Sequence, residues 1–146
     1  MLWDIRMGKP ILPLIGHVKQ IISSDFHLNG YHLVTGSDDN TIRFWDIRRK
    51  NCFNMLPAHN KLISDLKFQP EKSRFLVSAS YDKTCKIWSA KDWSLVRTLK
   101  AMDSKVTSIS ISEDMEYMAT TTLDRKWMLW SKTKKNGDNK SLILPE

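Results

Sequence analysis

The fold is decided by the stretch TGSDDNTIRFWD, residues 35–46, which returns in altered form as SASYDKTCKIW, residues 78–88. Tryptophans mark the period at intervals of 42, 43 and 42 residues, at Trp3, Trp45, Trp88 and Trp130. Two further markers keep the same step, namely the aspartates Asp39, Asp82 and Asp124 and the histidines His17 and His59. Three independent markers with one period indicate a chain built of repeated structural units.

Each repeat is predicted to contain short strands, because its apolar residues either alternate with polar ones or form short runs bounded by turn residues. The expected strands are 21–26, 32–36, 41–45 and 52–56 in the first unit, 63–68, 75–79, 84–88 and 94–99 in the second, and 106–111, 117–121 and 126–130 in the third. The sequence therefore predicts an all-β fold with one four-stranded antiparallel sheet per complete repeat.

The repeated segments resemble the WD-repeat family, from Leu2 to about Trp130. The Gly16-His17 pair and the two quoted stretches carry this resemblance. It implies a β-propeller, in which four-stranded blades surround a central channel and usually number seven. Three blades do not close such a ring, so we expect a β-propeller fragment whose partners include missing upstream blades.

The expected domain boundaries follow from this resemblance. Residues 1–15 would form the outer strands of a preceding, truncated blade, and the three blades would span about 16–57, 58–100 and 101–131. Residues 132–146 form a polar tail. Within it, 141–144 would either supply the last blade's outer strand, which the preceding Asn-Gly-Asp turn favours, or be disordered.

Some side chains have the composition of a hydrolytic triad, but they recur with every tryptophan. An enzyme needs one such set in one cleft, and the family resemblance instead implies a buried hydrogen-bonded tetrad in each blade. The expected tetrads are His17, Ser37, Asp39 and Trp45, then His59, Ser80, Asp82 and Trp88, then Thr122, Asp124 and Trp130. The third lacks a histidine because Met102 stands in its place. We expect no catalytic residue, metal site or cofactor.

A closer resemblance is to the C-terminal blades of the pre-mRNA processing factor four family, the WD-repeat subunits of the U4/U6 small nuclear ribonucleoprotein. It is carried by residues 27–52, 58–70 and 86–112, and above all by DWSLVRTL, residues 92–99. It implies a nuclear, non-catalytic scaffold that acts in splicing with pre-mRNA processing factor three, cyclophilin H and U4/U6 small nuclear RNA. The alternative is a generic WD-repeat adaptor, such as a ubiquitin-ligase substrate receptor.

Two surfaces are candidates for binding. Loops before the first strand and between the second and third strands should share one face, and its candidate protein-binding residues are Lys19, Asp38, Lys61, Tyr81 and Leu123. The opposite face should gather the basic residues Arg48, Arg49, Lys50, Lys91, Lys132, Lys134 and Lys135, beside Arg6 and Lys9. These cations would either bind RNA or an acidic protein segment, or form a solvated rim. Trp93 is expected to pack against the outer strand.

Composition sets the remaining limits. The 146 residues are 41% hydrophobic and carry a formal net charge of +7, from 23 basic and 16 acidic residues, which favours acidic partners. Cys52 and Cys85 lack the spacing of a zinc site or a disulfide framework, so reduced thiols are expected. No apolar run approaches the roughly 20 residues that span a bilayer, so we expect an intracellular protein without membrane contact.

Overall fold

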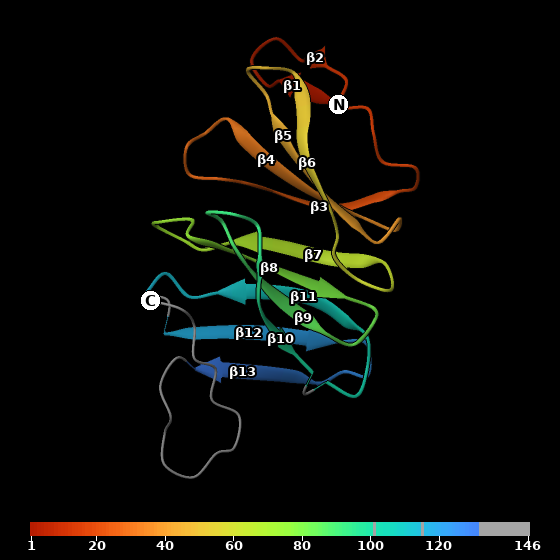
Figure 1. The fold of residues 1–146 in the computed structure, drawn as a ribbon, viewed down its shortest axis with the longest axis vertical. Coiled ribbons are helices and arrows are strands. Elements are labelled where there is room, and N and C mark those ends of the chain that lie inside the picture. The colour runs from red at the N-terminus through yellow and green to blue at the C-terminus, as the bar shows by residue number, and fades with distance from the viewer. Residues whose placement is uncertain (101, 115, 132–146) are drawn as a thin grey trace.

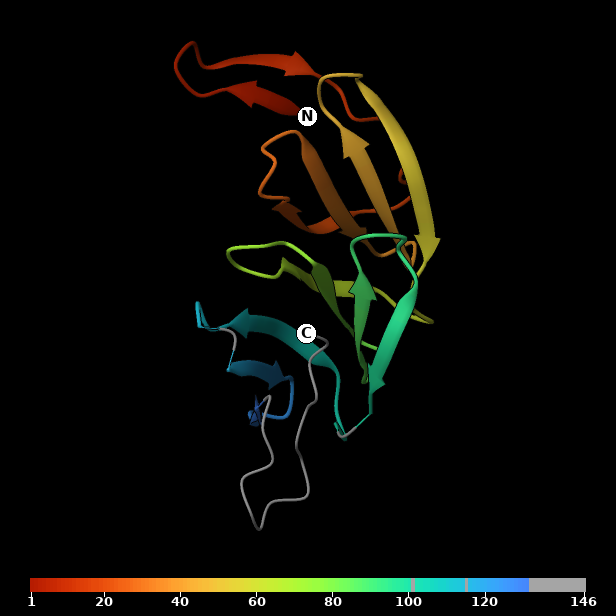
Figure 2. The same ribbon diagram turned by 60° about the vertical axis from the view of Figure 1, so that its left-hand side comes forward.

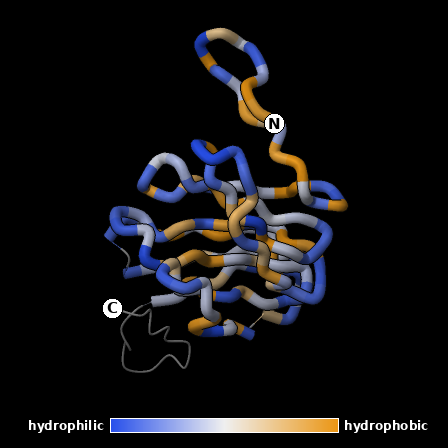
Figure 3. The backbone as a smooth tube through the Cα atoms, turned by 45° about the horizontal axis from the view of Figure 1, so that its top comes forward, coloured by the Kyte–Doolittle hydropathy of each residue, from blue (hydrophilic) through white to orange (hydrophobic). Residues whose placement is uncertain are grey.

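The chain folds into stacked antiparallel β-sheets, seen in a computed structural model that describes residues 1–100, 102–114 and 116–131. Within these ranges there is no helix. Two short strands, β1 (Leu2–Asp4) and β2 (Lys9–Leu12), pair as a hairpin. That hairpin stands apart from the stacked sheets (Figure 3). Assignment of residues 1–15 to a preceding blade stays a prediction.

Three larger sheets follow in chain order. The first contains β3 (Ile21–Phe26), β4 (His32–Ser37), β5 (Thr41–Asp46) and β6 (Asn51–Pro57). The second contains β7 (Ile63–Phe68), β8 (Phe75–Ser80), β9 (Cys85–Ser89) and β10 (Leu95–Leu99). The described part of the third contains β11 (Val106–Ile111), β12 (Tyr117–Thr122) and β13 (Trp127–Ser131). The expected strand at 141–144 lies outside the described residues.

Every sheet is a meander in which consecutive strands pair. The first strand of each sheet begins and ends where the sequence predicts, and the other predicted strands agree to within one or two residues. Tight turns between the second and third strands place Asn40, Lys83 and Arg125 at φ values of 68°, 71° and 67°. The all-β prediction is confirmed.

The sheets stack face to face and curve into an arc (Figures 1 and 2). Apolar residues from facing sheets form two separate cores. The core between the first and second sheets includes Val34, Phe44, Leu66 and Leu76, and the one between the second and third includes Val77, Ile87, Ile109 and Met118. Burial on both faces explains why β8 is buried along its whole length.

Aspartates fasten each sheet to the next at the first strands. Asp25 Oδ2 accepts from the backbone N–H of Phe68 at 2.7 Å, and Asp65 Oδ2 accepts from the backbone N–H of Ile109 at 2.8 Å. Ser108 also donates to Asp65, at 2.7 Å. These two aspartates do not occupy equivalent repeat positions, so the repeat pattern gave no sign of them.

Trp93 packs at the outer side of the contact between the first and second sheets, which we call the first seam. It lies in the β9–β10 turn at a φ of 60°, and its ring centroid is 4.0 Å from that of Phe44. The rings of Phe53 and Phe68 are each 6.5 Å away. Because Phe53 belongs to β6, Trp93 does pack against an outer strand, but it is the outer strand of the preceding sheet.

The two ends of the stack expose apolar side chains. Ile22 and Phe26 on β3 are 41% and 50% exposed, and Trp127 and Leu129 on β13 are 66% and 51% exposed. In the second sheet, the residues that match Phe26, Trp127 and Leu129 face a neighbouring sheet and are buried, and the residue that matches Ile22 is partly buried. Each end face therefore has the composition of an inter-sheet contact.

Candidate functional site

The repeated polar side chains of the second sheet form one hydrogen-bonded chain. Trp88 Nε1 donates to Ser78 Oγ at 2.9 Å, and Ser78 Oγ lies 2.8 Å from His59 Nε2. His59 Nδ1 lies 2.9 Å from Asp82 Oδ2, and Thr84 Oγ1 donates to Asp82 Oδ1 at 2.6 Å. An indole N–H can only donate, so the Ser78 hydroxyl accepts from Trp88 and donates its own proton to His59 Nε2. The proton of His59 is therefore on Nδ1, which donates to Asp82.

The first sheet repeats this arrangement. Trp45 Nε1 donates to Thr35 Oγ1 at 2.9 Å, Thr35 Oγ1 lies 2.7 Å from His17 Nε2, and His17 Nδ1 lies 2.8 Å from Asp39 Oδ2. Thr41 Oγ1 donates to Asp39 at 2.6 Å. Since every member has a partner within its own sheet, these side chains hold the sheet together.

These contacts correct the expected hydroxyl members of the tetrads. The hydroxyls between histidine and tryptophan belong to Thr35 and Ser78, whereas Ser37 and Ser80 bond to backbone groups. Ser80 Oγ donates to the carbonyl of Leu62 at 2.9 Å and accepts from the backbone N–H of Asp82 at 3.0 Å. Ser37 likewise accepts from the backbone N–H of Asp39, at 3.1 Å. The two serines thus fasten the turns rather than the tetrads.

The third sheet keeps only part of the network. Trp130 Nε1 donates to Thr120 Oγ1 at 3.0 Å, so Thr120 and not the expected Thr122 is the hydroxyl member. Thr120 Oγ1 in turn lies 3.8 Å from the sulfur of Met102, which occupies the place of the histidine. Thr122 instead donates to Asp124 at 2.5 Å. The network therefore stops at a thioether.

Asp124 finds a different charged partner. Lys126 Nζ lies 3.3 Å from Asp124 Oδ2, and this lysine replaces the threonine found at Thr41 and Thr84. The Asp124 side chain is 33% exposed, whereas that of Asp82 is 9% exposed. An ion pair at the surface therefore stands where the other sheets have a buried hydrogen bond.

The titration of the buried groups reflects these contacts. Burial by itself would raise the pKa of Asp82, but hydrogen bonds from His59 and Thr84 outweigh it and hold that pKa well below its usual range. The pKa of Asp39 is held low in the same way by Thr41 and His17. Burial lowers the pKa of His59, although Asp82 opposes the shift. The second tetrad thus joins a carboxylate to a neutral imidazole.

The described residues contain a buried cysteine but no cluster of metal ligands. Burial raises the pKa of the Cys85 thiol well above its usual range, so the thiolate that a nucleophile needs is not formed. Histidine, cysteine and carboxylate side chains come together in no set of three or more with metal-binding geometry in residues 1–100, 102–114 and 116–131. No helix long and apolar enough to cross a membrane occurs in that part of the chain.

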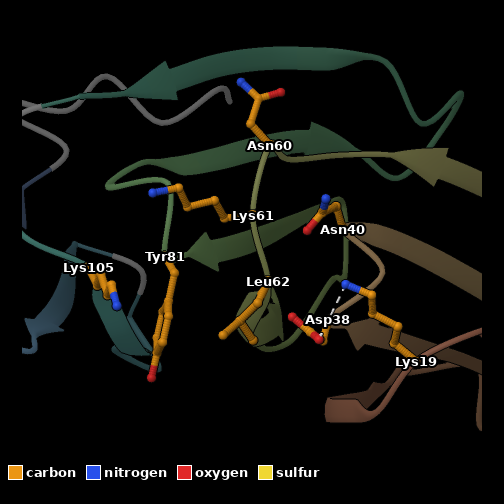
Figure 4. Close-up of a pocket in the computed structure, with 8 residues that line it drawn as sticks. All are labelled: Lys19, Asp38, Asn40, Asn60, Lys61, Leu62, Tyr81 and Lys105. Carbon is orange, nitrogen blue, oxygen red and sulfur yellow. Dashed lines mark ion pairs between the residues drawn. The ribbon is translucent and has the colours of Figure 1, made fainter.

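A hollow of about 340 Å³ opens on one face of the arc (Figure 4). We call this face the loop face; it comprises the loops before the first strand and between the second and third strands of each sheet. Its hollow is lined by Lys19, Asp38, Asn40, Asn60, Lys61, Leu62, Tyr81 and Lys105. All three sheets contribute, because Lys105 precedes β11.

The structure brings together four of the five residues predicted for protein binding. Leu123 does not line the hollow but lies beside it, since its backbone N–H donates to the carbonyl of Lys105 at 2.9 Å. Sequence reasoning missed the other four lining residues, Asn40, Asn60, Leu62 and Lys105. A signal for Lys105 existed, because Lys19, Lys61 and Lys105 follow one another by 42 and 44 residues.

The predicted basic face is partly neutralised. Arg48 stacks over the ring of Tyr31, with its guanidinium carbon 3.3 Å from the ring centroid, and its Nη2 lies 3.6 Å from Asp46. Arg49 pairs with the same carboxylate at 3.8 Å. Lys50 and Lys91 are exposed. Lys132, Lys134 and Lys135 lie outside the described residues.

Comparison with known proteins agrees with this geometry. The family model "WD domain, G-beta repeat" matches residues 8–46, 50–89 and 93–131. The chain belongs to the WD-repeat family. Its sheets are therefore blades, and its arc is part of a WD β-propeller. Proteins of this family generally act as binding scaffolds and not as catalysts.

Relatives of different function match the chain. It is 31% identical over 133 residues to a coronin-like protein of Saccharomyces cerevisiae, and 33% identical over 103 residues to WD repeat and SOCS box-containing protein 1 of Mus musculus. These alignments cover 80% and 70% of the chain, but 20% and 24% of the relatives. The U4/U6 small nuclear ribonucleoprotein PRP4-like protein of Arabidopsis thaliana is 43% identical over 63 residues, 43% of the chain and 11% of that protein.

Proposed function

We propose that this chain is a non-catalytic protein-binding scaffold of the U4/U6 and U4/U6.U5 small nuclear ribonucleoproteins, which act in pre-mRNA splicing. The observation that carries this proposal is the 43% identity to the PRP4-like protein, against 31% and 33% for the coronin-like and SOCS-box relatives. The chain spans only a small part of each relative, so the proposal concerns the role of these blades.

The geometry supports a scaffold. The histidines and aspartates that would otherwise suggest hydrolysis are used within their own blades, at distances of 2.8 and 2.9 Å. The loop face, in contrast, has a hollow lined by residues from all three blades (Figure 4). A partner seated there would contact all three blades at once.

The proposed partners follow from the resemblance to pre-mRNA processing factor four. They are pre-mRNA processing factor three, cyclophilin H and U4/U6 small nuclear RNA, in the nucleus. A second candidate function is that of a ubiquitin-ligase substrate receptor, which is supported by the SOCS-box relative whose alignment covers 70% of the chain. In both roles the loop face would hold a protein partner.

Affinity purification of the tagged chain from cell extract tests the proposal. We expect U4 and U6 small nuclear RNAs and splicing proteins to copurify, and Tyr81→Ala on the loop face to reduce their recovery. Lys72→Ala is the control and should not, because Lys72 is exposed in the turn between β7 and β8, on the opposite face, and belongs to neither candidate binding surface. Recovery of a cullin ubiquitin ligase without small nuclear RNA would contradict the splicing role and support the second candidate.

A further inference from the structure

We propose that the hollow on the loop face binds an acidic, extended peptide segment of a partner protein. In this arrangement carboxylates of the peptide lie against Lys61 and Lys105, and its backbone lies against Asn40 and Asn60. The inference rests on the proposed role of the loop face as the binding surface, and it adds the chemistry of the partner.

The charges around the hollow are unbalanced. Three lysines line it, and all three are exposed. One carboxylate in the lining, Asp38, lies 3.6 Å from Lys19 Nζ. Among the described residues no ion pair reaches Lys61 or Lys105, so both ammonium groups are free to meet an anion. The nearby carboxylates of Asp39 and Asp82 point inward, toward their own donors in the tetrads.

The neutral polar groups match a peptide backbone. Asn40 and Asn60 both line the hollow, and within the described residues neither side-chain amide makes a hydrogen bond. A side-chain amide offers both N–H donors and a C=O acceptor, which complement the C=O and N–H of a peptide unit. An extended segment has such groups free along its length, whereas a helix uses them internally.

The hollow also offers apolar contacts for one side chain of the peptide. Tyr81 and Leu62 are half-buried and line the hollow, and Leu123 lies 57% exposed beside it. Lys105 Nζ lies 5.1 Å from the centroid of the Tyr81 ring, so this cation and this aromatic face lie next to one another. An acidic residue followed by an apolar one would therefore contact Lys105 and Tyr81 together.

A nucleic acid fits the hollow less well. Single-stranded nucleic acid is usually held by several aromatic rings on which successive bases stack. This lining has one aromatic ring, Tyr81, and its Asp38 carboxylate would repel a phosphate. The lining therefore favours a peptide, and RNA becomes an outcome of the test.

Fluorescence anisotropy with labelled probes tests the proposal on the intact chain. The probe is a short synthetic peptide in which glutamate alternates with glycine, with one leucine near its centre; its control carries glutamine for glutamate. We expect Lys61→Glu and Lys105→Glu each to weaken binding of the glutamate peptide roughly three- to tenfold, and to make its affinity less dependent on salt. Asp38→Asn should strengthen binding, because it removes the one carboxylate in the lining.

Lys72→Glu is the control for net charge, because Lys72 is equally a surface lysine but lies in the turn between β7 and β8, on the opposite face. All these side chains are exposed or partly exposed, so the variants should fold, and their thermal transitions verify this. Equal binding of the glutamine peptide, or equal loss with Lys72→Glu, would overturn the proposal. Tighter binding of an oligouridylate than of the peptide would overturn it too.

The result also separates this inference from the proposed function. If Tyr81→Ala abolishes copurification of small nuclear RNA but the glutamate peptide does not bind, the loop face is the docking surface and its acidic partner is refuted. If the peptide binds at Lys61 and Lys105 but no small nuclear RNA copurifies, the hollow binds acidic segments and the splicing role is refuted.

Discussion

Replacing Asp82 with alanine removes the acceptor at the centre of the second tetrad. Asp82 accepts from His59 Nδ1 at 2.9 Å, Thr84 Oγ1 at 2.6 Å, and the backbone N–H groups of Thr84 and Asn60 at 3.0 and 3.2 Å. The His59 side chain is 0% exposed, and a buried donor without a partner costs about 1–3 kcal/mol. The other donors lie nearer to solvent and add less. We expect the free energy of unfolding to fall by about 1–3 kcal/mol.

Asp124→Ala is the matched control, because Asp124 holds the same repeat position without a histidine. It accepts from Thr122 and pairs with Lys126 at the surface, where solvent screens the charges, so its loss should cost clearly less than the loss of Asp82. Urea unfolding followed by tryptophan fluorescence, at one protein concentration for all variants, measures both values. Equal losses would refute the reasoning, because the buried imidazole would then contribute nothing beyond a surface ion pair.

Further predictions concern pH, the third tetrad, the first seam and the end faces. Acid should destabilise the protein in two steps. Because burial lowers the pKa of His59 in the folded state, the unfolded state binds a proton first as the pH falls below 6.5, and stability decreases. Asp82, whose pKa is also lowered, contributes stability above pH 3.8, and this contribution is lost as the pH falls further. Urea midpoints across buffers of decreasing pH measure both steps. A midpoint that stays constant as the pH falls below 6.5 would refute a neutral His59 imidazole in the folded state. Met102→His should raise the free energy of unfolding in urea by about 1 kcal/mol, because a hollow of about 270 Å³ beside Met102 leaves room for an imidazole to complete the tetrad. Trp93→Ala should cost about 2 kcal/mol, measured by thermal unfolding, because the half-buried ring seals a seam between blades. The exposed end faces should make the chain associate, so light scattering should give a mass above 17.0 kDa that Leu129→Lys lowers; a monodisperse monomer would contradict this.

The repeat period and the apolar pattern within it predicted the strands, and the resemblance to the WD-repeat family implied their assembly into blades. Strand positions followed from the alternation of apolar residues within each period, and the structure places β3, β7 and β11 at the predicted bounds. This succeeds because neighbouring blades impose the same demand on every repeat, namely apolar side chains on both sheet faces. The non-repeating contacts were missed, as Asp25 and Asp65 show, since they occupy different positions in their repeats.

The sequence by itself also determined which residue types the tetrads need and that the third blade lacks a histidine. Only the tertiary structure decided which hydroxyl takes part. Thr35 and Ser37 lie two residues apart in β4, so their side chains leave the sheet on the same face and spacing cannot separate them. The register between β4 and β5, which pairs Thr35 with Arg43, brings Thr35 within 2.9 Å of Trp45 Nε1. The hollow was likewise decided in space, because loops from three blades must first be brought together before Lys19, Lys61 and Lys105 can share one lining.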